Sequence, residues 1–117
     1  MTNLQEELSQ FYGSETFYRH PLFRKFVYTE GVQYLAEKGG AYWLVEYIFS
    51  NQTEEKIKSK EFQVWKIKVK EDHTAVIRVE DGNDNLVKQF ELEFTDFPLA
   101  EFTLWFSNNT LLLPSEW

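Results

Sequence analysis

The sequence contains no cysteine, only three prolines and five glycines, and no long apolar run. The absence of thiols excludes disulfides and thiolate chemistry and is compatible with a reducing compartment. No secretory signal is visible at the start of the chain. The longest apolar stretch, residues 41–49, is interrupted by Glu46 and is too short to span a bilayer. We therefore expect a soluble cytoplasmic protein that does not enter a membrane.

Positive charge is scarce in the second half of the chain. Residues 71–117 carry two basic side chains against ten acidic ones, whereas residues 1–70 carry ten against nine. The whole net charge of −7 therefore arises after residue 70. Such asymmetry predicts a polarised surface that steers a partner.

Aromatic residues, in contrast, are plentiful at 18%, and hydrophobic residues reach 43% of the 117 positions. This composition excludes a disordered chain, and the length suits one domain over residues 1–117. Helical spacing predicts three helices in the first half. The first helix is expected to begin after a cap at Asn3 and to end at Gly13. Thr29 is expected to cap the second helix. The second and third helices are expected over residues 30–38 and 41–50, with a loop over residues 51–55. The third is apolar nearly all round and is the expected centre of the core.

From residue 61 the apolar period changes from 3.6 to 2, which indicates β-strands. These are expected in residues 61–71, 74–80, 86–94, 102–106 and 111–113. A two-residue turn at Asn108 and Asn109 would pair Phe106 with Leu111 and Leu104 with Leu113 on one face. The pattern predicts an α+β fold: N-terminal helices packed on one face of a C-terminal antiparallel sheet of four to five strands, arranged as a meander.

Residues suited to catalysis are few. With two histidines and no cysteine, a zinc site would need carboxylates from several loops, so no metal, cofactor or catalytic residue is assigned. Glu46 is the one acid in the apolar helix, and the favoured interpretation is that it faces outward or forms a salt bridge. A small enzyme centred on Glu46 and His20 is the alternative, so we leave the question of catalysis open while favouring its absence.

Two charged surfaces are candidates for partner binding. Acidic residues of the second half form a candidate interaction rim: Asp81, Asp84, Glu91, Glu93 and Asp96. Six lysines between Lys56 and Lys70 share one parity, so a single extended strand would display them as a stripe, with Lys66, Lys68 and Lys70 as its candidate core. The plainer interpretation of the stripe is a solvated sheet face or a guarded edge strand.

Several segments are similar to those of a known family: FYGSE (11–15), YRH (18–20), YTEGVQYLAEK (28–38), GAYWL (40–44), FQVWK (62–66), TDFPL (95–99) and LLPSE (112–116). They resemble a family of small uncharacterised proteins found in bacteria, notably cyanobacteria, and on phages and plasmids. The family has no assigned activity, so it assigns no role to any residue. The resemblance implies a mobile-element setting.

Taken together, these features predict a small acidic protein that binds a macromolecule without catalysis. We expect a protein partner with a basic surface. A nucleic-acid binder that uses the Lys56–Lys70 stripe is a second alternative, and the oligomeric state is left open.

Overall fold

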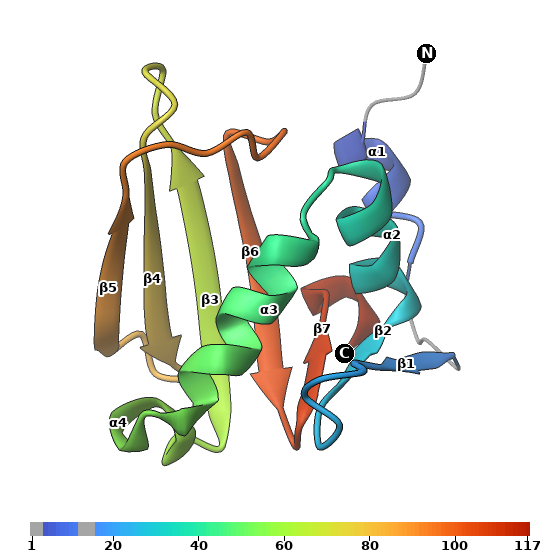
Figure 1. The fold of residues 1–117 in the computed structure, drawn as a ribbon, viewed down its shortest axis with the longest axis vertical. Helices are drawn as coiled ribbons and strands as arrows, with labels where there is room; N and C mark the ends of the chain where they lie inside the picture. The colour runs from blue at the N-terminus through green and yellow to red at the C-terminus, as the bar shows by residue number, and fades with distance from the viewer. Residues whose placement is uncertain (1–3, 12–15) are drawn as a thin grey trace.

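The computed structural model describes residues 4–11 and 16–117, which form an α+β structure around one mixed sheet (Figure 1). The strands are β1 Phe17–Arg19, β2 Val27–Thr29, β3 Phe62–Val69, β4 Ala75–Asp81, β5 Leu86–Leu92, β6 Glu101–Ser107 and β7 Thr110–Leu112. The helices are α1 Leu4–Leu8, α2 Glu30–Lys38, α3 Tyr42–Ser50 and α4 Glu55–Lys58, with short 3₁₀ turns η1 Asn51–Thr53 and η2 Pro114–Glu116. None of the helices within these ranges has the length and apolar character needed to cross a membrane.

The sheet has seven strands in the order β1-β2-β7-β6-β3-β4-β5, so the expected meander of four to five strands is wrong in two respects. First, β6 pairs with β3 rather than with β5, because residues 93–100 cross the end of the sheet before β6 begins (Figure 1). Second, β2 joins the sheet in parallel with β7, so the sheet is mixed. Strands of three residues, such as β1 and β2, are too short to show a period of two.

The predicted helices are largely confirmed. Thr29 accepts a hydrogen bond from the Val32 N–H and so caps α2, which spans Glu30–Lys38 as expected. The third helix begins at Tyr42, one residue later than predicted. The expected loop at residues 51–55 instead contains η1 and the start of α4. Asn3 and Gly13, the predicted ends of the first helix, lie outside the described residues.

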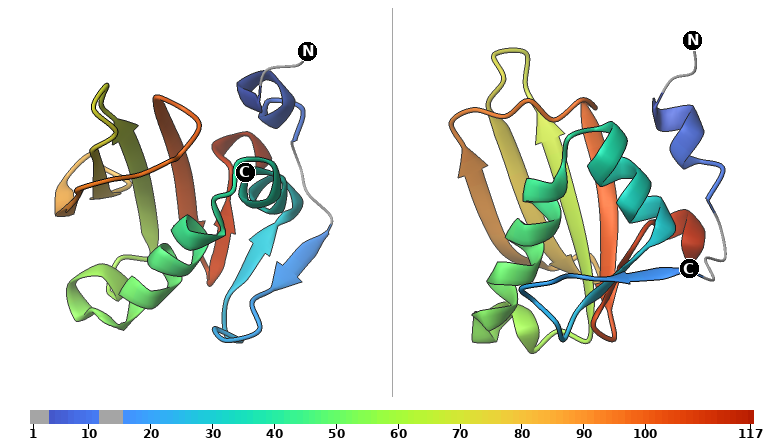
Figure 2. Two further views of the ribbon diagram at one scale, coloured as in Figure 1. Left: turned by 45° about the horizontal axis from the view of Figure 1, so that its top comes forward. Right: turned by 45° about the vertical axis from the view of Figure 1, so that its right-hand side comes forward.

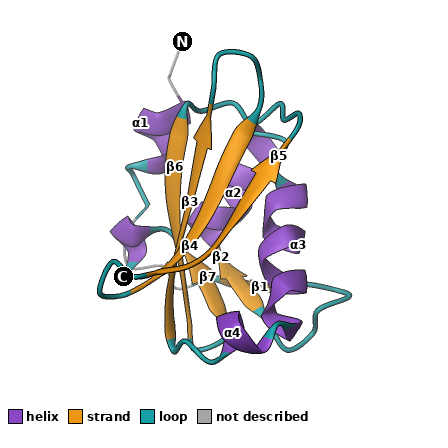
Figure 3. Cartoon of the chain, turned by 90° about the vertical axis from the view of Figure 1, so that its left-hand side faces the viewer, coloured by secondary structure: helices purple, strands orange, loops and turns teal. Residues whose placement is uncertain are grey.

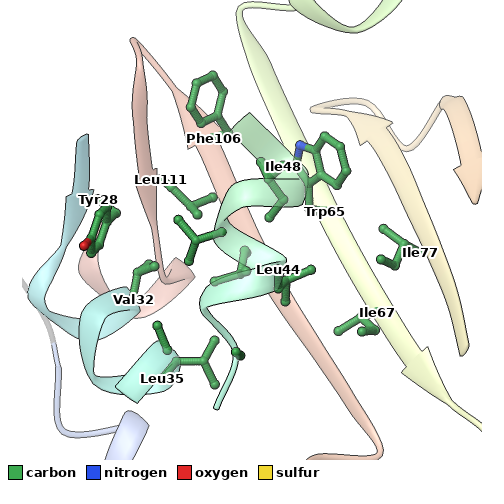
Figure 4. Close-up of a cluster of buried hydrophobic side chains, with 14 of the residues drawn as sticks. Tyr28, Val32, Leu35, Leu44, Ile48, Trp65, Ile67, Ile77, Phe106 and Leu111 are labelled. Carbon is green, nitrogen blue, oxygen red and sulfur yellow. The ribbon is translucent and has the colours of Figure 1, made fainter. Parts of the chain in front are cut away.

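One face of the sheet forms the core against α2 and α3, which lie on the same side of it (Figure 2). Trp65 and Ile67 of β3 point toward this side and are buried, as the alternation predicted. Figure 4 shows Ile48 of α3 next to Trp65, with Leu44 one helical turn away. Apolar side chains on both elements exclude water from this layer, and their burial is the main favourable contribution to folding.

The turn at Asn108 and Asn109 has the predicted geometry. Both residues have positive φ angles, 54° and 60°, as a two-residue hairpin turn requires. Phe106 pairs with Leu111 as expected. β7 ends at Leu112, so Leu113 lies beyond the ladder, although it is still buried.

We call the opposite side of the sheet the outer face. Figure 3 shows α1 and α3 on opposite sides of strands β3, β4 and β5, so the expectation that the N-terminal helices pack on one face of the sheet is wrong for α1. Because Trp65 and Ile67 face the core, Lys66 and Lys68 must face outward. The outer face therefore collects the polar half of each alternating strand.

Candidate functional site

The outer face contains a hollow of about 970 Å³, which is the candidate site. Its floor is formed by strands β3 to β6, and its side is formed by α1 and by the segment at η2. The polar side chains around it include Gln5, Lys66, Lys68, Arg78, Thr103 and Ser115. A volume of this size lies at the upper end of the range for small-molecule sites, so the hollow has room for a short stretch of polypeptide.

Strand register brings the basic side chains of the hollow together. Lys66 lies directly between Arg78 of β4 and Thr103 of β6, because β3 pairs antiparallel with both of these strands. Lys68 lies two residues further along and is paired in register with Glu101. Directly opposed residues are about 5 Å apart at Cβ, so these groups form one cluster.

Glu80 holds two of the three cations in place. Its carboxylate lies 2.9 Å from the Lys66 ammonium and 3.4 Å from Nε of Arg78. Glu80 is 6% exposed, whereas the two basic side chains are about half exposed. Lys68 forms no ion pair within the described part of the chain. One buried acid therefore orients two cations without neutralising the cluster.

An aromatic cluster continues the outer face beyond the hollow. The rings of Phe62, Trp105 and Trp117 pack edge to face, with centroids 5.2–5.7 Å apart. Trp105 lies two residues from Thr103, on the same side of β6. Trp117 is 71% exposed. An exposed tryptophan beside a basic hollow is typical of a binding surface, because aromatic side chains supply large contact areas.

The C-terminal segment that borders the hollow is fixed by a buried carboxylate. Glu116 accepts hydrogen bonds from the hydroxyl of Thr29 (2.6 Å), from the N–H of Gly31 (3.1 Å) and from the N–H of Leu113 (3.0 Å). Its charge thus lies at the N-terminus of α2, where the helix dipole favours an anion. Thr29 was recognised in the sequence as a cap, but nothing in the local sequence indicates that Glu116 would reach it.

The structure also joins the two residues of the enzyme alternative. Nε2 of His20 lies 3.0 Å from the carboxylate of Glu46, whose side chain is 50% exposed, so Glu46 faces outward and is hydrogen-bonded to His20. Nδ1 of His20 accepts hydrogen bonds from the N–H groups of Leu22 and Phe23, at 3.0 and 3.2 Å. These two donors assign the proton to Nε2, which donates to Glu46.

Both ring nitrogens of His20 are therefore engaged within the protein. A histidine that acts as a general base needs one nitrogen directed at the substrate or nucleophile. Here that nitrogen instead holds the backbone of residues 22 and 23. Two other polar side chains, Arg19 and Tyr42, have hydrogen-bond partners elsewhere. Arg19 donates to the carbonyl of Arg24, and Tyr42 accepts a hydrogen bond from Gln33. Within the described residues, neither forms a hydrogen bond with His20 or Glu46. This arrangement is suited to anchoring a loop.

A model of a family of unknown function, DUF6876, matches residues 2–117. The chain belongs to this family. Comparison with curated proteins and with solved structures gives no match. Membership supports the resemblance to an uncharacterised family found in the sequence, and it assigns no role to a residue, so the functional argument rests on the geometry of this chain.

The candidate acidic rim is not continuous. Asp81 ends β4 and Asp84 lies in the turn before β5, whereas Glu91, Glu93 and Asp96 lie at or beyond the far end of β5. Asp81 accepts hydrogen bonds from the backbone of Asn85 and Asn83, and these bonds hold its pKa below the usual range. Asp81 therefore closes its own turn.

The candidate lysine stripe is also interrupted. Residues 56–70 do not form one strand, because α4 and the residues after it precede β3. Lys66 and Lys68 reach the hollow, whereas Lys70 follows the end of β3 and does not line it. Lys58 and Lys60 line a separate pocket together with Lys25. The single strand on which the stripe depended is absent, because a period of two cannot distinguish a strand from alternate residues in a short helix and loop. Of the plainer interpretations, the guarded edge strand is wrong, since β3 lies between β6 and β4.

Another buried polar group was not recognised from the sequence. Gln52 and Gln63 exchange amide hydrogen bonds of 2.9 and 2.8 Å, and Gln63 also accepts from the indole N–H of Trp65. The pair ties η1 to β3. Glutamine has no strong positional preference, so no sequence signal could have found it.

Within the described ranges, no three histidine or acidic side chains cluster in a way that could hold a metal ion. His73 lies in the turn between β3 and β4 with a φ of 66°, and its ring centroid is 6.0 Å from that of Phe94.

Proposed function

We propose that this protein binds another protein without catalysing a reaction, and that it holds an acidic, extended segment of its partner in the hollow of the outer face. The observation that carries the proposal is the convergence of Lys66, Lys68 and Arg78 on one hollow of about 970 Å³ in a chain of net charge −7. Charge complementarity at such a site steers encounter and fixes the register of the bound segment.

The aromatic cluster extends this argument from charge to contact area. A segment that lies along β3 and β6 would pass from the basic hollow to the rings of Trp105 and Trp117. Aromatic anchors of this kind supply much of the binding energy in protein interfaces. The proposed ligand is therefore an acidic segment that also carries an apolar or aromatic residue.

A nucleic acid fits the hollow less well. Glu101 is among the lining residues, and Glu80 pairs with two of the three cations. A nucleic acid carries a negative charge on every nucleotide and would bring a phosphate close to these acids, whereas a peptide can place neutral residues there. A basic protein on the acidic rim is also less well supported, because the rim is divided between the two ends of β5.

We further propose a cytoplasmic location and a mobile-element setting, both of which rest on the sequence.

The test compares two single charge reversals. Lys68→Glu places an acid in the hollow without breaking an ion pair, whereas Lys70→Glu makes the same change two residues further on, outside it. The probe is a set of fluorescein-labelled peptides rich in Asp and Glu with one Trp, measured by fluorescence anisotropy. We expect Lys68→Glu to weaken binding at least tenfold, about 1.4 kcal/mol, and Lys70→Glu to leave it unchanged.

Three results would overturn the proposal. The first is an equal effect of both substitutions, since a general loss of charge would then explain the data. The second is tighter binding of a single-stranded DNA or RNA oligonucleotide than of any acidic peptide, with the same dependence on Lys68. The third is the absence of binding to every peptide.

A further inference from the structure

A second pocket is lined by residues of α4, of the loop before β2 and of the β6–β7 turn. These elements lie at the bottom of Figure 1. The volume of the pocket is about 490 Å³. Lys25 comes from the loop before β2, Lys58 from α4, and Lys60 from the segment that leads into β3. We call it the lysine pocket. The lining therefore contains three lysines, one from the loop before β2 and two from the end of α4 and the residues after it.

The lining of the lysine pocket contains three lysines and one acid, Glu61. Lys58 pairs with Glu55 at 3.2 Å, but both side chains are more than half exposed, so solvent weakens this pair. Neither Lys25 nor Lys60 forms an ion pair in the residues the structure describes, although the charge of Lys60 helps to lower the pKa of Asp81. Like charges that line one pocket repel one another, and a bound anion would relieve that repulsion.

The walls of the lysine pocket are held in place by the fold. The exchanged amide bonds of Gln52 and Gln63 form part of its lining, and Gln63 also donates to the carbonyl of Ile57 at 3.0 Å. On the other side, the Asn109 carbonyl accepts a hydrogen bond from the Val27 N–H at 3.0 Å. A site whose walls do not need to be ordered on binding loses less conformational entropy.

We propose that the lysine pocket binds a small molecule that carries at least two linked phosphate groups. Lysine ammonium groups bind phosphate as point charges, and three of them match a diphosphate or triphosphate better than a single monovalent anion. The polar side chains of Ser107, Asn108 and Asn109 line the same pocket and add neutral hydrogen-bonding groups. The volume is within the range of small-ligand sites. This site is separate from the outer-face hollow and does not depend on the function proposed for it.

The experiment titrates the intact protein with pyrophosphate and with adenosine triphosphate at constant ionic strength, followed by two-dimensional NMR of the amide groups. Sulfate serves as the control for nonspecific anion binding. We expect saturable shifts confined to residues around Lys25, α4 and Asn108. Lys60→Gln and Lys25→Gln are each expected to weaken binding at least tenfold. Lys56→Gln, on α4 but outside the pocket, should leave it unchanged.

The outcomes separate this site from its alternatives. Lys68→Glu should not affect phosphate binding, so failure of the outer-face proposal leaves this one standing. The proposal is overturned if pyrophosphate gives no saturable shifts, if sulfate matches it, or if Lys56→Gln has the same effect as Lys60→Gln. Tighter binding of an oligothymidine, lost in the same variants, would also overturn it in favour of a nucleic-acid backbone. Thermal unfolding without ligand confirms that each variant is folded.

Discussion

At the scale of single residues, Gly31 shows how closely α2 and the C-terminal segment approach each other. A Cβ added at Gly31 would lie 2.6 Å from Oε1 of Glu116 and 2.7 Å from Cδ1 of Leu113. Neither group can withdraw easily, because the Glu116 carboxylate is buried and bonded to Thr29 and Leu113. A side chain at position 31 would therefore displace Glu116 or Leu113, which is why glycine is required there.

Gly31→Ala should therefore destabilise the protein by about 1 kcal/mol. Overpacking costs about 1–3 kcal/mol and outweighs the gain of about 0.5–1 kcal/mol that alanine brings to a helix. Gly82→Ala is the matched control, because its nearest contact would be an ordinary 3.4 Å to Phe62. Urea unfolding measures both. Equal stability of the two variants would show that Glu116 does not occupy the helix N-terminus.

At the scale of elements, the β4–β5 hairpin depends on an ionised side chain. The pKa of Asp81 is lowered chiefly by the backbone hydrogen bond from Asn85, and then by that from Asn83. A carboxyl with a pKa below its unfolded value of about 3.9 stabilises the folded state above that pH. This stabilisation is lost as the pH falls through the folded pKa.

Asp81→Asn should flatten the acid side of the stability curve, because asparagine retains an acceptor but cannot be protonated in this range. Asp84→Asn is the control, because it removes one negative charge from the same hairpin. The φ of Asp84 is 64°, a left-handed value that asparagine tolerates, so the backbone is not strained. This variant should leave the acid side of the stability curve unchanged. Urea midpoints between neutral pH and about pH 2.5 make the comparison. A parallel shift of both variants would mean that overall charge, rather than the turn, sets the acid stability.

At the scale of the whole molecule, the contact between α3 and the sheet holds the fold together. Leu104 lies on the core side of β6, opposite Trp65, and is 2% exposed. Leu104→Asp should unfold the protein at room temperature, since a buried unpaired charge costs several kcal/mol. Thr103→Asp, on the outer face one residue away, should remain folded. Circular dichroism distinguishes the two, and a folded Leu104→Asp variant would contradict this core.

The fold was predictable where its signal is local. Alternation assigned the faces of Trp65 and Lys66, capping marked the start of α2 at Thr29, and two asparagines marked the last turn. The α+β class follows from the order of these signals. Strand order was not predictable in the same way, because β6 could pair with either β3 or β5 without changing the face of any side chain.

The candidate site was predictable only in part. Lys66 and Lys68 were recognised as outward-facing, and Glu46 and His20 were named together. The structure changes the interpretation of His20, because its Nδ1 accepts hydrogen bonds from the backbone of Leu22 and Phe23 and is not available to a substrate. The hollow itself requires α1 and η2 to lie beside the outer face, and neither short element carries a sequence signal for that position.

The sequence by itself therefore determined the buried faces of β3, β4 and β6, where α2 begins and how β6 turns into β7. These properties depend on the period of side chains and on backbone preferences within a few residues. The sequence did not determine the buried face of β5, where Leu86 is 48% exposed and Val87 is 5% exposed. Only the tertiary structure decided the mixed strand order, the position of Glu116 at α2 and the grouping of lysines into two pockets. Each of these joins residues distant in the chain, and their pairing depends on shape and unsatisfied hydrogen bonds that exist only once the core has formed.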